Sequence, residues 1–493
     1  MHPYLMKSAV ELAALVREGE TTSRELVDLS LERLRAVNPI LNSVARARVR
    51  EAKREADEAD ALLADVGPDR VGPLHGVPCT IKESFAVTGM PQSAGLVARK
   101  DLRAEHDATA VRRLRDAGAI VVGVTNIPEL VMWMETSNNI YGRTRNPYDL
   151  GRIVGGSSGG EGASVGAAIA PFGLGADIGG SIRMPAFFNG VFGHKPSSGL
   201  VPNTGQWPIA ENEALSYLCT GPLARRAEDL PLLLEIMAGP DDTCAACREM
   251  RLRDVRGVDV ASLRVLDVPD NGLIGVHASL RQAQRRAADA LRSRGARVEE
   301  RRFGRLKKSL QYWGAGLSNA GGTPFGVLMG QGERVAFVPE MLKWALGRSA
   351  HTFPAIMLAG LELIPERFPS QTDAIVRELD ELREELSDAL GDDGVMLYPS
   401  YSRPAPRHHA PFTHPFDFMY TAIINVLGFP STQVPLGLER RGLPVGVQVV
   451  AAHGNDHLTL AVARELERAL GGWVPPPHRS RYGPKRTYIP GAP

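Results

Sequence analysis

The stretch from Gly151 to Gly205 constrains the fold of this chain more than any other. Glycines are dense between Gly155 and Gly199, and three serines, Ser157, Ser158 and Ser181, stand among them without bulky neighbours. Glycine loses the most backbone entropy on folding, so such density indicates unusual dihedrals or close approach to another group. A solvated Gly/Ser linker would not carry the large apolar residues found here, which are Ile178, Met184, Phe187, Phe188, Val191 and Phe192. We predict a buried, tightly turned, chemically active segment; a glycine-packed structural core is the alternative.

Composition narrows the class of protein. The chain has 493 residues, 43% of them hydrophobic, enough for one large α/β domain or two to three smaller ones. A net charge of +1 with mixed signs predicts no nucleic-acid surface. Four scattered cysteines do not suggest a disulfide framework. Cys244 and Cys247 form one CxxC, but a structural zinc site needs four ligands and no second pair exists, so we predict no metal site.

The first twenty residues contain no apolar run long enough for a signal peptide. No window of the sequence approaches the roughly 20 apolar residues that a membrane span needs. We therefore expect a soluble, cytoplasmic protein with no membrane span. The number of associating chains is left open, a homodimer included.

Periodicity and capping residues predict an α/β protein. Capping boxes begin helices at Ser8 and Thr22, ending near Gly19 and Ala36. Asp107 is expected to cap a helix that Gly118 stops, before a buried strand over 119–124, which is typical of α/β folds. Further helices are expected over 45–64, 160–170, 225–238, 278–294, 370–390, 416–427 and 456–470, and strands over 77–81, 264–269, 296–301, 395–398, 432–437 and 445–451. We expect one domain with a helical arm (1–66), a core (72–240), a variable cap (303–368), a C-terminal part of the core (395–475) and a surface tail from Pro475.

Lysine is rare here, because only nine of the 57 basic residues are lysine. Lys82 lies in the motif GVPCTIKE, at the end of the strand-like run. Unlike arginine, lysine can lose its proton when buried, and a pKa of roughly 7–8 makes it a general base at neutral pH. Lys82 is therefore a candidate base for a serine nucleophile, with a second serine relaying the proton.

A different reading of the serines stays open. Gly155 to Gly159 match the G-x-S-x-G nucleophile elbow, with Ser157 as nucleophile of an α/β-hydrolase. An elbow follows a buried strand, whereas the residues before this one, NPYDLGRIV, resemble a turn. His75 and His194 are the two histidines within glycine-rich motifs, each either a base or a hydrogen-bonding support.

The run from Ile178 to Ser181 offers backbone N–H groups with almost no side chain in the way, as an oxyanion hole requires. Asp177 and Arg183 flank the run, and we expect them to form a structural ion pair.

Together, GVPCTIKE, GGSSGGEGA and GADIGGSIRMPAFFNGVFGHKPS resemble the amidase signature family, and in particular its fatty acid amide hydrolase branch. ETSNNIYGRTRNPYD, GPLAR and NVLGFPSTQVPLGLERRGLPVGVQVVA extend the resemblance, which is weakest over 240–395. It implies a large central mixed, twisted β-sheet surrounded by helices. It also implies hydrolysis of a carboxamide to an acid and an amine or ammonia through an acyl-enzyme, without metal or cofactor.

The resemblance also assigns roles to residues. It implies a Ser–cis-Ser–Lys triad with Ser181 as nucleophile, Ser157 as relay and Lys82 as base, while Ser158 is a supporting hydrogen bonder. The implied oxyanion donors are the amides of Ile178, Gly179, Gly180 and Ser181. Three alternatives remain: an amidotransferase subunit that supplies ammonia to a partner, an ester hydrolase, and a non-catalytic amide-binding protein.

The substrate is the least constrained part of the prediction. The cap over 303–368 is rich in aromatic residues and methionine, which suits either a substrate pocket or ordinary helix packing. The candidate pocket residues are Met132, Trp133, Met134 and Trp313. Membrane-bound members of the resembling branch carry a hydrophobic N-terminal anchor that this sequence lacks, which argues against a long-chain lipid. We expect a small amide with an apolar or aryl acyl part.

Overall fold

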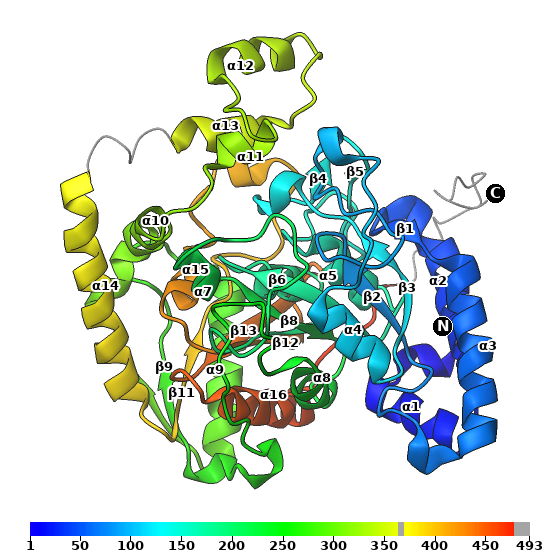
Figure 1. The fold of residues 1–493 in the computed structure, drawn as a ribbon. Helices are drawn as coiled ribbons and strands as arrows, with labels where there is room; N and C mark the ends of the chain where they lie inside the picture. Colours follow the sequence, from blue (N-terminus) through cyan, green and yellow to red (C-terminus); the bar gives the residue numbers. More distant parts are fainter. Residues whose placement is uncertain (363–368, 478–493) are drawn as a thin grey trace.

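A mixed β-sheet of eleven strands runs through the middle of the molecule (Figure 1). The computed structural model describes residues 1–362 and 369–477. The strand order is β1-β3-β2-β6-β8-β7-β12-β13-β11-β9-β10. The strands are β1 (Val44–Ala47), β2 (Pro78–Lys82), β3 (Ile120–Thr125), β6 (Phe172–Asp177), β7 (Phe192–Lys195), β8 (Cys219–Ala224), β9 (Arg264–Asp267), β10 (Arg297–Glu300), β11 (Gly394–Tyr398), β12 (Ser431–Leu438) and β13 (Pro444–Val450). This sheet confirms the predicted fold class.

Two parallel blocks, β3-β2-β6 and β11-β9-β10, are joined by antiparallel strands. The joining strands are β8, β7, β12 and β13. Every residue of β2, β6 and β13 is buried, as expected for strands covered on both faces. A separate short hairpin, β4 (Ser137–Asn138) and β5 (Gly142–Arg143), lies outside the large sheet.

Helices surround the sheet, and each predicted helix has a counterpart among them, whereas those over 183–188, 214–217 and 309–361 were not predicted individually. They are α1 (Ala9–Arg17), α2 (Ser23–Leu41), α3 (Val49–Val66), α4 (Thr109–Asp116), α5 (Gly159–Gly166), α6 (Arg183–Phe188), α7 (Ala214–Tyr217), α8 (Asp229–Met237), α9 (Ala278–Ser293), α10 (Ser309–Asn319), α11 (Phe325–Met329), α12 (Phe337–Ala345), α13 (Phe353–Leu361), α14 (Pro369–Leu390), α15 (Met419–Val426) and α16 (Asp456–Leu470). None of the helices within the described ranges is long and apolar enough to cross a bilayer.

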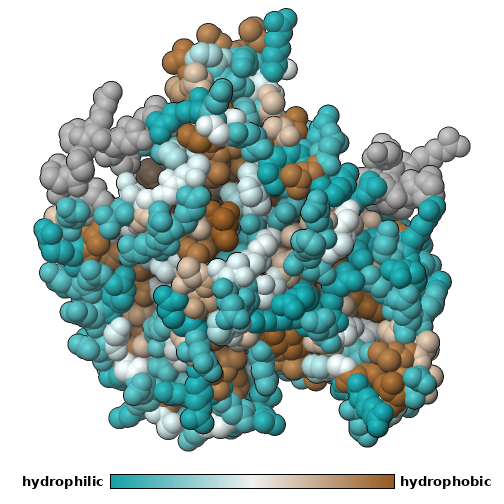
Figure 2. Space-filling view, viewed as in Figure 1, coloured by the Kyte–Doolittle hydropathy of each residue, from teal (hydrophilic) through white to brown (hydrophobic). Residues whose placement is uncertain are grey.

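The cap helices α11, α12 and α13 project from one end of the molecule in Figure 1. Figure 2 shows apolar residues gathered on this projection, and the large exposed ones on and beside α12 are Val338, Leu342, Trp344 and Leu346. Residues 363–368 of the expected cap and 478–493 of the expected surface tail lie outside the described residues.

The N-terminal arm is not purely helical, which corrects the prediction. β1 pairs antiparallel with β3 and extends the sheet, in a stretch expected to begin a helix at residue 45. The helix from Thr22 runs to Leu41 rather than Ala36. Asn38 explains the boundary, because its side chain accepts hydrogen bonds from the backbone N–H groups of Ser43 and Val44 and so fixes the turn between helix and strand.

Three other helix ends were predicted wrongly. Asp107 does not cap α4, because its carboxylate accepts hydrogen bonds from the backbone N–H and the hydroxyl of Thr88. α8 begins at Asp229 rather than Arg225, because the chain first turns away from β8 and the Ala227 N–H donates to Glu467. α5 ends at Gly166, four residues before the expected end.

Two motifs that are distant in sequence meet at the carboxyl ends of neighbouring strands in the sheet. β2 ends at Lys82 and its parallel neighbour β6 ends at Asp177, four residues before Ser181. The carboxyl ends of neighbouring parallel strands lie on the same side of a sheet, where ligands bind in open α/β folds. α5, which begins just after Ser157, contacts both strands.

A substitution at Gly160 tests how closely α5 packs against the residues beside the sheet. An added Cβ would lie 2.5 Å from backbone atoms of Asn126 and 2.6 Å from the carbonyl oxygen of Ser43, neither of which can move freely. We expect Gly160→Ala to lower the free energy of unfolding by about 3 kcal/mol, measured by urea denaturation. Gly304→Ala is the control, because its Cβ meets no atom within 4 Å; an equal loss in both variants would contradict the packing argument.

Candidate active site

Lys82 ends β2 with its side chain 1% exposed. Its Nζ donates to Ser157 Oγ at 2.7 Å and to the carbonyl oxygen of Ala176 at 3.4 Å. Burial lowers the Lys82 pKa to about 7, although the negative charges of Asp177 and Glu161 oppose the shift. Near neutral pH, this amine therefore exists partly in the neutral form, which can accept a proton.

Ser157 lies in a tight turn before α5. The Gly156–Ser157 peptide bond is cis, as the resemblance implied. A Cβ on Gly156 would lie 2.1 Å from the backbone oxygen of Trp133, so this turn requires glycine. The next residue, Ser158, donates its N–H to the carbonyl oxygen of Ser181 at 3.1 Å. This bond joins the turn that carries Ser157 to the turn that carries Ser181, and these two turns are called the two serine loops below. The Ser158 hydroxyl donates to the carbonyl oxygen of Ala176 at 3.3 Å, the same oxygen that accepts a hydrogen bond from Lys82.

Ser181 stands between a strand and a helix. β6 ends at Asp177 and α6 begins at Arg183, which is the strand–turn–helix setting that a nucleophile elbow uses. No strand immediately precedes Ser157, so the elbow pattern in the sequence lacks the context it requires. Ser181 is 8% exposed against 2% for Ser157, and its hydroxyl has no hydrogen-bond partner among residues 1–362 and 369–477.

The turn from Asp177 to Ser181 is wound around the Asp177 carboxylate. This carboxylate accepts the N–H of Gly180 at 2.6 Å and the N–H of Ile182 at 3.1 Å. Gly180 has φ +117°, and a Cβ there would lie 2.0 Å from the Thr421 hydroxyl, so only glycine fits. The N–H groups of Ile178, Gly179 and Ser181 donate to no acceptor in the described chain, whereas that of Gly180 is occupied.

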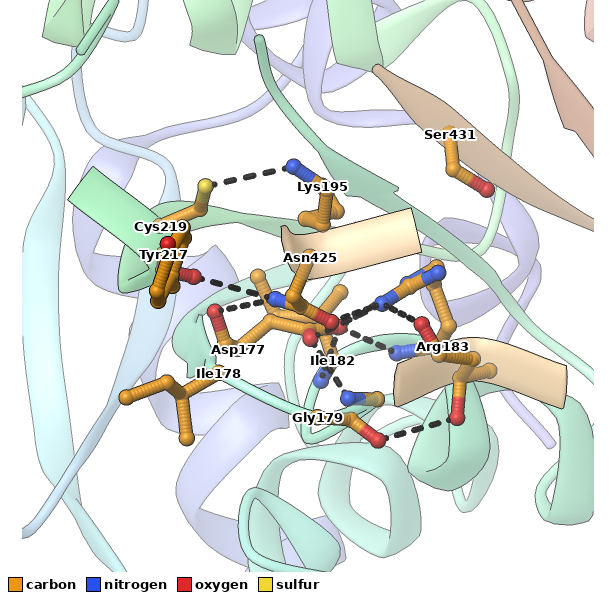
Figure 3. A network of polar contacts seen from close by, with 12 residues as sticks. Asp177, Ile178, Gly179, Ile182, Arg183, Lys195, Tyr217, Cys219, Asn425 and Ser431 are labelled. Carbon is orange, nitrogen blue, oxygen red and sulfur yellow. Dashed lines mark hydrogen bonds and ion pairs between the residues drawn. The ribbon is translucent and has the colours of Figure 1, made fainter. Parts of the chain in front are cut away.

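Arg183 pairs with Asp177, as expected. Both side chains are fully buried, and the guanidinium lies 3.0 Å from the carboxylate (Figure 3). Its remaining N–H groups donate to Gln448, to the backbone oxygen of Thr421 and to Asn425. Burial alone would raise the Asp177 pKa, but Arg183, Lys195 and the backbone N–H of Ile182 together outweigh burial and hold the pKa well below the usual range. Asp177 is therefore ionised near neutral pH.

A buried carboxyl beside Lys82 was not predicted from the sequence. Glu161 lies on α5 and accepts hydrogen bonds from the hydroxyls of Thr80 at 2.6 Å and Thr125 at 2.7 Å. Burial raises its pKa to about 8, against the opposing effects of these hydroxyls and of Lys82. A signal was present, because Glu161 is a lone charge in a glycine-rich run, one helical turn after Ser157.

The two candidate histidines lie away from the serines. His75 hydrogen-bonds to the backbone oxygen of Ala59, and His194 bonds to Thr432 and Asp456. Both therefore support neighbouring backbone and side chains in this structure. No group of three or more His, Cys, Asp or Glu side chains in the described ranges is placed to hold a metal ion.

The four candidate pocket residues divide into two kinds. Trp133 and Trp313 are half-buried; the backbone of Trp133 touches Gly156, and the Trp313 indole covers Gly179. Met134 is buried in the main core, where its sulfur accepts a hydrogen bond from Tyr401. Met132 is half-buried in the loop before Trp133. The two tryptophans therefore flank the two serine loops.

Comparison with known proteins gives a consistent family. The family profile described as Amidase matches residues 25–460. The chain is 45% identical to fatty-acid amide hydrolase 2 of Homo sapiens, over 96% of this chain and 91% of that protein. It is 31% identical to one subunit of the glutamyl-tRNA(Gln) amidotransferase of Halorhodospira halophila, over 94% and 97% of the two chains. A solved bacterial aryl acylamidase of the amidase signature family superposes with a TM-score of 0.79 at 25% identity, over 94% and 96%. This chain belongs to the amidase signature family and is an amide-hydrolysing enzyme.

Proposed function

We propose that the enzyme hydrolyses a carboxamide with an apolar or aryl acyl part, using Lys82 as base, Ser157 as relay and Ser181 as nucleophile. The observation that carries the proposal is the 2.7 Å hydrogen bond between Lys82 Nζ and Ser157 Oγ in a buried site. The low pKa of Lys82 lets the neutral amine take a proton near pH 7. The bond from the Ser158 N–H to Ser181 brings the third member next to this pair.

In the first half-reaction, Ser181 Oγ attacks the amide carbonyl carbon and loses its proton to Ser157 Oγ. Ser157 passes its own proton to neutral Lys82 Nζ. The C–N bond then breaks as a proton returns from Lys82 through Ser157 to the leaving nitrogen, so that the amine departs neutral. In the second half-reaction, water attacks the ester of Ser181, the same relay removes and returns a proton, and the acid leaves with the free hydroxyl restored.

The loop before Ser181 supplies the charge stabilisation that the tetrahedral intermediate needs. The N–H groups of Ile178, Gly179 and Ser181 are free to donate to the developing oxyanion. Gly180 contributes through its conformation, because its N–H is held by Asp177. Fixed donors aimed at a developing charge lower the barrier, and loss of one such donor costs about 10²–10³ in kcat.

Two features support an apolar or aryl acyl group. The Trp313 indole covers Gly179, and the backbone of Trp133 touches Gly156 while its ring packs on Phe412 with ring centroids 5.2 Å apart. The 45% identical human relative is named for fatty-acid amides, and a structural neighbour is named for aryl acylamides. Aromatic walls of this kind gain free energy by removing apolar acyl groups from water.

The first test asks whether the chain works alone and which serine reacts. We expect the purified protein to hydrolyse a simple anilide and a fluorophosphonate probe to form one adduct, on Ser181, mapped by peptide mass spectrometry. Ser181→Ala should lose both adduct and turnover, because no other hydroxyl occupies the nucleophile position. Ser164→Ala is the control, since that buried hydroxyl on α5 has no hydrogen-bond partner in the described part of the chain.

Each alternative has its own signature in this test. An adduct on Ser157 would favour the elbow arrangement and overturn the assignment of the nucleophile. Ser181 labelling without turnover of any amide by the pure chain would favour an amidotransferase subunit, the function named for the 31% identical relative. Turnover of matched esters but not of amides would indicate an ester hydrolase.

The second test uses the pKa of Lys82. Because the neutral amine is the base, kcat/KM should rise with pH, reach half its maximum near pH 7 and stay level above it. Lys82→Ala should lower kcat by about 10³-fold with little change in substrate affinity, and the deficit should be largest at and above neutral pH. A pH profile like that of the wild type in this variant would rule out the base role.

The same lysine should affect stability with a predictable sign. Its pKa is 10.5 in the unfolded chain and about 7 in the folded protein, so folding expels a proton between these values. The folded state therefore loses stability as the pH falls from 10.5 to 7, and the penalty is complete below 7. Lys82→Met should raise Tm relative to wild type more at pH 7 than at pH 10. Ser157→Ala keeps the lysine buried and should keep the pH dependence of the wild type.

A further inference from the structure

Three successive carbonyl groups in the turn before Ser181 are held by side chains from other elements. Asn425 Nδ2 donates to the carbonyl oxygen of Asp177 at 2.9 Å (Figure 3). Trp313 Nε1 donates to the carbonyl oxygen of Ile178 at 3.0 Å, and the Thr421 hydroxyl donates to that of Gly179 at 3.0 Å. Asn425 and Thr421 lie on α15, whereas Trp313 lies on α10 in the cap.

Holding a carbonyl group also orients the N–H of the next residue. The peptide bonds of this turn are trans, and in a trans peptide the C=O and the following N–H point in opposite directions. Asn425 therefore orients the N–H of Ile178, Trp313 orients that of Gly179, and Thr421 orients that of Gly180. The first two of these N–H groups are free to donate to a ligand.

We propose that Trp313 is a positioning residue for amide hydrolysis, because it fixes the direction of the Gly179 N–H in the oxyanion hole. The inference rests on the proposed function and adds a residue from the cap to its machinery. The Trp313 ring also lies 3.4 Å from the position of a Cβ on Gly179, so it limits movement of that residue sideways. An edge-on contact with Phe418, with ring centroids 5.1 Å apart, holds the indole in place.

The side chain of Trp313 makes only one hydrogen bond within the described residues, whereas those of the other two donors make more. Asn425 also bonds to the backbone of Tyr217 and to Arg183, and Thr421 also bonds to the backbone of Phe418, so both would matter for packing alone. The indole N–H of Trp313 makes a single hydrogen bond, and the Ile178 carbonyl accepts no other within the described part of the chain. Removing that N–H therefore changes one peptide orientation with little other disturbance.

Substitution of Trp313 separates positioning from packing. Trp313→Phe keeps an aromatic ring against Phe418 and removes the donor. Trp473→Phe is the matched control, because Trp473 also donates its indole N–H to a backbone oxygen, that of Gly166 at 3.2 Å, at a buried place away from the serines. We expect Trp313→Phe to lower kcat about 10-fold with KM within twofold of wild type, a fraction of the effect of losing a whole oxyanion donor. Trp473→Phe should retain the kcat of the wild type, although its Tm should be comparable to that of Trp313→Phe.

Two more measurements address a merely structural role. Trp313→His should recover part of the kcat, because Nε of the imidazole is the same number of bonds from Cβ as Nε1 of the indole and can donate to Ile178. Inhibition by a trifluoromethyl ketone, whose adduct with Ser181 places an oxyanion in the hole, should weaken about 10-fold in Trp313→Phe. The midpoint of the pH profile should not move, because Lys82 is untouched.

The outcomes distinguish this inference from the proposed function. If the wild type hydrolyses amides but the kcat values of Trp313→Phe and Trp473→Phe agree within twofold, the inference is wrong and the function stands. A raised KM with unchanged kcat would make Trp313 a substrate contact and would also overturn it. If the wild type hydrolyses no amide, the proposed function fails, and the rate of fluorophosphonate labelling of Ser181 decides the inference instead. Slower labelling in Trp313→Phe supports positioning, and equal rates contradict it.

Discussion

The buried ion pair between Asp177 and Arg183 is the interaction on which the site depends. Removing one member of a buried pair leaves an unpaired charge and typically costs about 3–5 kcal/mol. Here the pair also organises backbone, because Asp177 accepts N–H groups from the turn and Arg183 donates to α15 and to Gln448 of β13. The turn before Ser181, the helix after it and the far half of the sheet are therefore fixed relative to one another.

The local parts of the site could be predicted from the sequence, and the long-range parts could not. Lys82, Ser157 and Ser181 stand in motifs whose glycines reveal close packing, as the contacts of Gly156 and Gly180 bear out. Trp313 was predicted only as a candidate pocket residue and Asn425 was not predicted at all, because neither stands in a glycine-rich motif. On an amphipathic helix, periodicity shows which face is buried but not which distant backbone group that face will meet. Their contacts with the turn before Ser181 span sequence separations of 135 and 248 residues.

The wrong predictions about secondary structure also arise from long-range contacts. β1 is four residues long and lies between two helices, so its own pattern is too short to indicate a strand. Pairing with β3 makes it one, because strand formation depends on neighbours more than on intrinsic preference. Asp107 has the right residue type for a helix cap, but Thr88, nineteen residues earlier, competes for its carboxylate. In both places a tertiary contact overrides a local preference.

The chemistry of Lys82 depends on a second proton, that of Glu161. An ionised Glu161 would favour the ammonium form of Lys82, whereas a protonated Glu161 leaves burial to favour the neutral amine. The protonation state of each group therefore affects the other, and a neutral amine beside a neutral acid has the same net charge as an ammonium beside a carboxylate. The Thr80 and Thr125 hydroxyls hold the carboxyl in place, and Gly173 leaves room for it, since a Cβ there would lie 1.8 Å from Glu161 Oε2. The base that we propose for neutral pH is thus a property of β2, β3, β6 and α5 together, rather than of the lysine alone.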